Sequence, residues 1–435
     1  MTCEIAVANR LGVALAADSA VTFTKQTNDG RRTSTYSSGA NKILQPLKRE
    51  PVALMVYDNA ELGEMPWELV VKQFRSLDGD DSEEFVSGYM GRLIKFINGS
   101  EELFPMEWRN HQTQRLYGVG LIRLVHTLRQ RFPIVADANA SFGAKLAAGA
   151  QLALDLEADL DAAPIADGLV EADYLSALSG HAVELVAEVG DAIQANAPDL
   201  ANVLDAATYL RLAIKLAFKW PWEVTGTPSG IVIAGYGASE VLPSFVEHAF
   251  MGFVGTSICS VERAAKSVPR GGVGAVIEAF ARKAMVETFT QGVSPEAWVQ
   301  AETEFRVRAD ELFGLAVAES GPAAIQPTDA RREQLVAAAT DQFKQRWADA
   351  SLEAHWRPLL EVVASLPVDQ LAELAENLVM LESLKERVTR RTQSVGGPID
   401  VAVITKAEGL IWIKRKHFFR PDLNQRYFAR FSDGG

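Results

Sequence analysis

The 435-residue chain has only two cysteines, no excess of positive charge and no long hydrophobic run. Cys3 and Cys259 cannot build a disulfide framework, which favours a reducing compartment. The formal net charge of −13 argues against nucleic acid and anionic membranes as partners, because clustered Lys and Arg bind both. No apolar run is long enough to span a bilayer, and the apolar start lacks the basic leader of a signal peptide. We therefore expect a soluble cytoplasmic protein.

Metal and nucleotide motifs are also lacking. The six histidines have no metal-ligand spacing, and we expect no metal and no cofactor. The glycine-rich run 271–274 lacks the lysine of a phosphate-binding loop and the full dinucleotide pattern, so we interpret it as a tight turn. The basic, aromatic stretch 413–431 is interpreted as a packed tail or a subunit contact.

Apolar residues make up 48% of the chain, which is enough for a sizeable core. Period-two patterns and turn signals predict strands at both ends and past the centre. These are 3–9, 12–17, 42–45, 52–57, 230–237, 242–249, 252–261, 398–405 and 410–414, with a polar loop at 23–40. Helical periodicity predicts helices at 60–74, 82–97 (capped by Asp81 or Ser82), 139–161, 170–197, 204–218, from the glycine run to 290, 295–318, 329–356 and 368–391.

The candidate chemistry lies at the N-terminus. Removal of Met1 would give Thr2 both a hydroxyl and a free α-amine, and an α-amine has a pKa near neutral, so that it can activate the hydroxyl as a nucleophile. Asp18 ends an otherwise apolar strand, and a buried carboxylate there needs a partner. Lys42 can supply that partner, and an ammonium near the hydroxyl would lower the hydroxyl's pKa.

The segment 2–19 (TCEIAVANRLGVALAADS) resembles the start of proteasome β subunits and of their bacterial ring-protease relatives. The separation of sixteen residues between Thr2 and Asp18 matches that family, and Lys42 falls where the family has its catalytic lysine. The run 395–405 (VGGPIDVAVIT) and the central segment 230–250 are similar to further family strands. The resemblance covers about 2–75, 228–292 and 367–415.

This resemblance implies an α+β fold, the four-layer αββα sandwich of N-terminal-nucleophile hydrolases, with helical insertions. The implied division of the sandwich is 2–99, 228–292 and 367–435, interrupted by helical insertions at 100–227 and 293–366. The implied catalytic residues are Thr2, Asp18 and Lys42, with Ser19 in a supporting role. Asp58 stands where the family has a glycine at the start of its first helix, and its backbone N–H would form the oxyanion hole. Ser394 lies one residue from a supporting family serine.

Three functions fit this pattern. The first is a proteasome-like threonine peptidase that acts on peptides or proteins as a homo-oligomer. Because the chain has no ATPase motif, any energy-dependent unfolding would come from a separate ATPase unfoldase. The second is an amidohydrolase for small molecules, since a fold does not fix a substrate. The third is a non-catalytic scaffold subunit, which requires that Met1 stays on or that the N-terminus is blocked.

Overall fold

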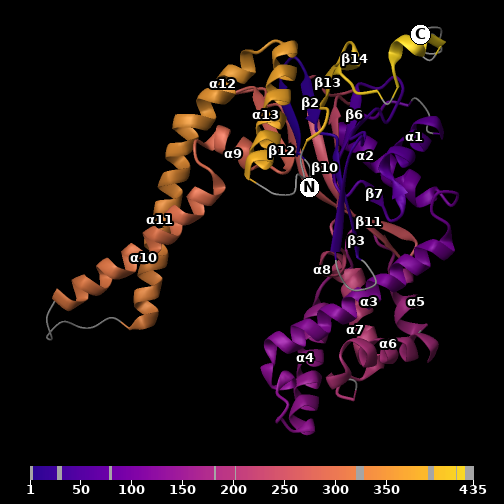
Figure 1. The fold of residues 1–435 in the computed structure, drawn as a ribbon, viewed down its shortest axis with the longest axis vertical. Coiled ribbons are helices and arrows are strands. Elements are labelled where there is room, and N and C mark those ends of the chain that lie inside the picture. Colours follow the sequence, from indigo (N-terminus) through magenta and orange to yellow (C-terminus); the bar gives the residue numbers. More distant parts are fainter. Residues whose placement is uncertain are drawn as a thin grey trace.

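The computed structural model describes residues 3–26, 32–77, 81–180, 183–200, 202–319, 328–389, 396–417 and 419–426. The fold is mixed, with antiparallel sheets and many helices (Figure 1). Within these residues, no helix combines the length and the apolar character needed to cross a membrane.

The first sheet joins the two ends of the chain. Its strand order is β12-β1-β2-β13-β14, and all its pairs are antiparallel. The strands are β1 (Cys3–Asn9), β2 (Val13–Ala17), β12 (Ala275–Ala281), β13 (Asp400–Thr405) and β14 (Gly409–Lys414). Ala17 pairs with Glu4 on one side and with Asp400 on the other. The start and the end of the sequence are therefore neighbours across β2.

The second sheet has the order β11-β10-β9-β6-β5 and is also antiparallel. Its strands are β5 (Ile43–Leu44), β6 (Val52–Asp58), β9 (Ser229–Gly235), β10 (Ser244–Val254) and β11 (Ser257–Ser267). Lys42 directly precedes β5, and its carbonyl accepts the backbone N–H of Val56 at 2.8 Å. This bond holds Lys42 against the neighbouring strand.

The two sheets face each other through a shared core. Ala6 and Leu15 from the first sheet belong to the same buried cluster as Met55 and Val232 from the second. Successive strand residues point to opposite faces, so Ile5 instead packs in a different cluster, against helices. Side chains of β1 at even positions therefore face the second sheet.

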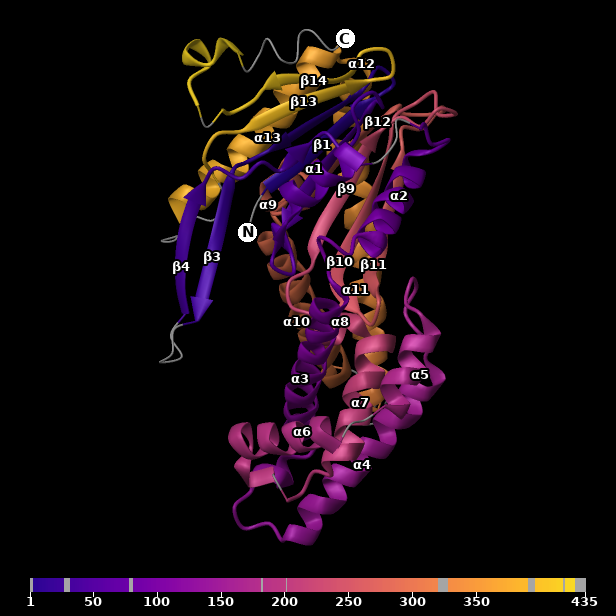
Figure 2. The ribbon, with the colours of Figure 1, turned by 90° about the vertical axis from the view of Figure 1, so that its right-hand side faces the viewer.

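Helices cover the outer faces of both sheets (Figure 2). The outer face of the first sheet packs against α12 (Arg357–Ser365) and α13 (Val368–Thr389). The outer face of the second sheet packs against α1 (Trp67–Leu77) and α2 (Val86–Gly99). Short segments complete the chain: β3 (Ala20–Gln26), β4 (Arg32–Ser38), β7 (Glu61–Leu62), β8 (Met65–Pro66), η1 (Pro133–Ala136), η2 (Pro198–Leu200), η3 (Leu352–Trp356) and η4 (Pro421–Leu423).

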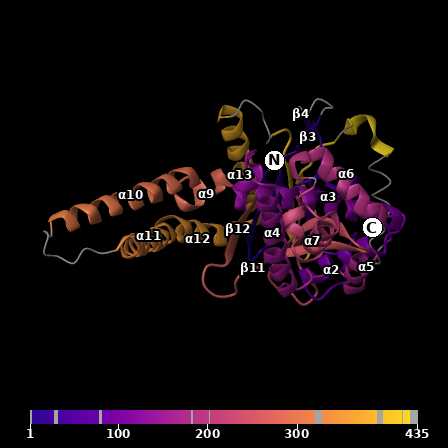
Figure 3. The same ribbon diagram turned by 90° about the horizontal axis from the view of Figure 1, so that it is seen from below.

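Two helical blocks extend from the sheets. The first packs around its own core and contains α3 (Met106–Arg131), α4 (Phe142–Ala162), α5 (Glu171–Ser179), α6 (Val183–Asn196), α7 (Ala206–Lys219) and α8 (Pro221–Val224). The second follows α9 (Ala284–Gln291) and is an antiparallel pair, α10 (Pro295–Glu319) and α11 (Asp329–Ser351), that projects away from the body (Figure 3).

The predicted strands at both ends of the chain are confirmed, but other expectations are wrong. The expected loop 23–40 contains the hairpin β3–β4, which pairs Ala20 with Ser38. The expected helix after the glycine run begins as strand β12, because this segment pairs along the whole of β1. The helix expected from 60 begins at Trp67, because the small hairpin β7–β8 comes first.

The expected cap of α2 is also wrong. The helix begins at Val86, after Phe85, and neither Asp81 nor Ser82 caps it. The Val86 amide instead donates to Oε2 of Glu240, at 3.0 Å. A carboxylate distant in sequence thus does the work of a local N-cap.

Candidate active site

Asp18 is placed beside Cys3 by the hairpin β1–β2. The turn closes where the Asn9 amide donates to the Gly12 carbonyl at 3.0 Å. At the other end of the hairpin, the Asp18 amide donates to the Cys3 carbonyl at 3.2 Å. The Cys3 amide donates in return to Oδ1 of Asp18, also at 3.2 Å. The carboxylate is therefore fixed at the start of β1.

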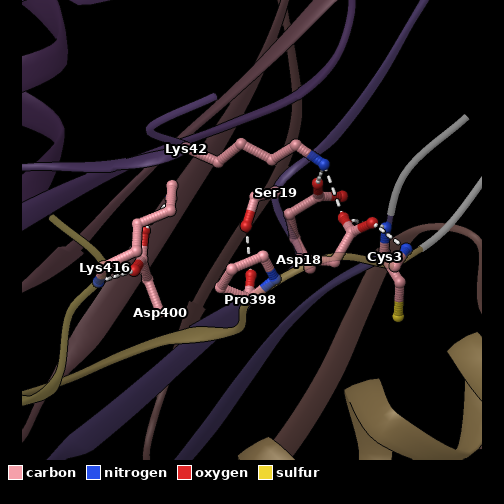
Figure 4. A network of polar contacts seen from close by, with 9 residues as sticks. Cys3, Asp18, Ser19, Lys42, Pro398, Asp400 and Lys416 are labelled. Atoms are coloured by element: carbon pink, nitrogen blue, oxygen red, sulfur yellow. Dashed lines mark hydrogen bonds and ion pairs between the residues drawn. The ribbon is translucent and has the colours of Figure 1, made fainter. Parts of the chain in front are cut away.

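Lys42 meets this carboxylate inside the protein (Figure 4). Its Nζ lies 2.5 Å from Oδ1 of Asp18 and 3.1 Å from Oε1 of Glu4. The exposed fractions are 4% for Lys42, 1% for Asp18 and 0% for Glu4. The predicted pair Asp18–Lys42 is thus brought together, with a second carboxylate added to it.

The surroundings keep Lys42 charged. Burial lowers the pKa of the Lys42 ammonium, but the charges of Glu4 and Asp18 outweigh burial, and the net effect raises the pKa above its ordinary value. A buried charge is stable only when it is paired and hydrogen-bonded. The cluster therefore presents an ammonium held by two carboxylates at neutral pH.

The second oxygen of Asp18 is bound by the C-terminal segment. Oδ2 accepts the backbone N–H of Gly396 at 2.7 Å. Gly396 and the following Gly397 have φ values of 147° and 79°, a region that side chains with a Cβ rarely adopt. The two glycines before β13 thus allow the backbone to approach the carboxylate.

Ser19 is buried and links three segments. Its amide donates to the Gly396 carbonyl at 3.2 Å, and its hydroxyl donates to the Pro398 carbonyl. Its own carbonyl accepts the amides of Gly39 and Ala40 at 3.1 and 3.3 Å. Ser19 thereby connects the end of β2 to the C-terminal segment and to the residues just before Lys42.

Asp58 is the last residue of β6 and has a φ of 61°, a left-handed conformation that favours glycine. Burial raises the pKa of its carboxyl, and the charge of Arg263 opposes this rise. The expectation that Asp58 stands at the start of the first helix is wrong, since α1 begins only at Trp67. The hairpin β7–β8 separates the two.

Two candidate residues, Thr2 and Ser394, lie outside the described residues. Cys3, which follows Thr2 in the sequence, is fully buried, and burial, followed by the charge of Glu4, raises the pKa of its thiol well above the ordinary value. The thiol is therefore neutral, and since the thiolate is the nucleophilic form, the environment disfavours Cys3 as a nucleophile.

Glu4 is the residue that sequence reasoning missed. The signal was present, because Glu4 is the one charged residue within the apolar run 3–9. The argument that predicts a partner for Asp18 applies equally to an acidic residue inside a buried strand. Both carboxylates contact the ammonium of Lys42. Among the described residues, no group of three or more His, Cys, Asp or Glu side chains could hold a metal ion.

Comparisons with known proteins give little. No family model matches the chain, and no curated protein matches it. Among solved structures, it is similar to the Anbu (Gly-1) mutant from Hyphomicrobium sp. strain MC1. The identity is 8% and the TM-score is 0.28, with 100% of this chain and 96% of that chain covered. A likeness at this TM-score carries no structural argument.

Proposed function

We propose that the chain is an amide hydrolase of the N-terminal-nucleophile type, with Thr2 as the nucleophile after removal of Met1. The observation that carries this proposal is the buried ion pair of Lys42 with Asp18 at the start of β1. The Cys3 amide that donates to Asp18 is the nitrogen of the Thr2–Cys3 peptide bond. Thr2 is therefore one peptide bond away from an amide that is hydrogen-bonded to Asp18.

The proposed reaction is acyl transfer. The Thr2 hydroxyl loses its proton to its own α-amine, and its oxygen forms a bond to the carbonyl carbon of an amide. The leaving amine takes up the proton as the C–N bond breaks, which leaves an ester on Thr2. Water then hydrolyses the ester and restores the hydroxyl. The Lys42 ammonium stabilises the negative charge that develops on the hydroxyl oxygen.

The fold proposed for this reaction is the four-layer αββα sandwich with helical insertions at 100–227 and 293–366. It is supported by the core shared between the sheets and by the helices packed on both outer faces. The backbone N–H of Asp58 is proposed as the oxyanion donor, since its left-handed backbone suits the glycine of the resembled family. Ser394 is proposed to orient the amine.

The substrate proposed is a peptide or protein, and the active form proposed is a homo-oligomer. Both follow from the sequence resemblance over segments 2–75, 228–292 and 367–415. Small amides are the alternative substrates, and a non-catalytic scaffold is the alternative role.

The decisive experiment is intact-mass spectrometry before and after treatment with a peptide epoxyketone. This reagent forms a ring with both the hydroxyl and the free amine of an N-terminal threonine, so it reports both groups together. We expect a chain without Met1 and one stable adduct that maps to Thr2. The Thr2→Ala variant, which keeps a small residue for Met1 removal, is the matched control and should form no adduct.

Each other outcome changes the proposal. A chain that keeps Met1 contradicts the catalytic proposal and favours the scaffold. Loss of Met1 without an adduct argues against a peptide-accepting pocket and directs the assay to small amides. An adduct at Cys3 would contradict the assignment of the nucleophile.

A further inference from the structure

Glu4 occupies a costly position. It lies in β1 with an exposed fraction of 0%, between Cys3 and Ile5, both of which are also fully buried. Burying a carboxylate is unfavourable unless an opposite charge and hydrogen bonds compensate for the loss of water. An apolar side chain at this position would avoid that cost. The feature that accounts for the carboxylate is the Lys42 ammonium, 3.1 Å away.

We propose that Glu4 is a positioning residue, which with Asp18 fixes the Lys42 ammonium at the start of β1. This inference rests on the proposed function, because it assigns Glu4 a role toward the same nucleophile. Glu4 does not itself react; it acts through Lys42.

The position of Glu4 within the sheet supports this positioning role. Glu4 is held from both sides, by pairing with Ala17 of β2 and with Phe280 of β12. Lys42 enters from the other sheet, where its carbonyl is fixed by Val56. The Glu4–Lys42 ion pair therefore joins the two sheets at the residue next to Cys3. A shift of one sheet against the other would move the ammonium away from the start of β1.

The charged and titratable groups that act on Lys42 come from β1 and from the end of β2. Burial lowers the pKa of the Lys42 ammonium, and the charges of Glu4 and Asp18 together raise it above its ordinary value. The Cys3 thiol is also close, but its raised pKa keeps it neutral. Glu4 therefore acts on the Lys42 ammonium together with Asp18.

The test removes the charge of the Glu4 side chain while its shape stays nearly the same. Glu4→Gln removes the negative charge, Glu4→Asp keeps it, and Glu278→Gln is the matched control. Glu278 lies on β12, opposite Ala6 of β1, and pairs with Lys266 at a more exposed position. Two readouts are taken on the full chain: the pH titration of ¹³Cε-labelled lysines, with the Lys42 signal assigned by its loss in Lys42→Met, and the rate of epoxyketone adduct formation against pH.

We expect Lys42 to lose its proton at lower pH in Glu4→Gln than in the wild type, with an intermediate result in Glu4→Asp. Adduct formation should slow roughly tenfold in Glu4→Gln, less than the about 100-fold expected for a group that transfers a proton. The alkaline limb of its pH profile should move in the same direction as the Lys42 titration. Glu278→Gln should change neither readout.

An unchanged Lys42 titration in folded Glu4→Gln would overturn the inference. Asp18→Asn is a second variant, which leaves Glu4 as the charged partner, in case Glu4→Gln does not fold. In Asp18→Asn the Lys42 signal should still titrate above the surface lysines, and a fall to their range would equally overturn the inference. If the wild type loses Met1 but forms no adduct, the proposed peptide substrate fails, whereas the lysine titration still decides the role of Glu4.

Discussion

Gly396 donates its backbone N–H to Oδ2 of Asp18 at 2.7 Å, across 378 positions of sequence. The other oxygen of the same carboxylate binds Lys42. The C-terminal segment thus holds one side of a carboxylate whose other side holds the lysine. Stability of the fold and geometry of the candidate site therefore depend on the same contacts.

The first prediction concerns the backbone beside this contact. Gly397 has a φ of 79°, so Gly397→Ala should destabilise the protein by about 1–2 kcal/mol, the cost of a left-handed backbone for a residue with a Cβ. Urea unfolding measures this loss. Gly118→Ala in α3, where a new Cβ would meet nothing within 4 Å, should instead stabilise by about 0.5–1 kcal/mol. Equal changes in the free energy of unfolding for the two substitutions would contradict the left-handed backbone of Gly397.

The second prediction compares two lysines. Lys42→Met leaves two buried carboxylates without their cation, and breaking a buried pair in this way costs about 3–5 kcal/mol. It should also slow epoxyketone adduct formation by at least about 100-fold. Lys72→Met removes a pair with Glu68 in which the lysine side chain is 56% exposed, and it should cost less than about 1 kcal/mol. A similar loss for both variants in chemical unfolding would refute the prediction.

The third prediction tests the packing next to Asp58. A Cβ at Gly230 would lie 1.9 Å from the ring of Tyr57, whose hydroxyl donates to Glu247. Gly230→Ala should therefore destabilise the protein by about 1–3 kcal/mol through overpacking. Gly91→Ala in α2 meets nothing within 4 Å and serves as the control. Calorimetry should show a lower Tm for Gly230→Ala alone; an unchanged Tm would mean that Tyr57 is not held there.

The fourth prediction concerns alkaline pH. Burial, and then the hydrogen bond to Glu50, raise the pKa of Tyr89 to about 12 from 10.0. The folded state therefore holds this proton more tightly, so the stabilisation is complete below pH 10.0 and is lost as the pH rises toward about 12. Tyr89→Phe should lower stability at pH 8 by about 1 kcal/mol and should lose less stability between pH 8 and pH 11 than the wild type. Identical slopes of unfolding free energy against pH would contradict this.

Local sequence patterns predict the strands that pair with the next strand along the chain. The apolar runs 3–9 and 12–17 follow each other in the sequence and form a hairpin through a short turn. Both strands can therefore be recognised from their own residues. The residues of segment 275–281 predict a helix instead of the observed strand, because nothing within them reveals that β1 provides the hydrogen-bonding edge. A strand fixed by a distant partner has a weak local signal.

The candidate site shows the same division. Asp18 could be named from its apolar strand, since a buried carboxylate needs a partner, and Lys42 could be named from its place in the resembled family. That Glu4 shares the lysine could not be named, because it requires the register that places Glu4 toward the facing sheet.

By itself, the sequence determined the strands at both ends, the acidic and apolar character of the chain, and the residue types of the candidate site. The tertiary structure alone decided that Lys42 is held by two carboxylates, that Gly396 closes over Asp18, and that Asp58 ends a strand. The physical reason is that the apolar character of the strands at both ends is carried by adjacent residues, whereas the pairing of buried charges depends on which segments the two sheets bring face to face.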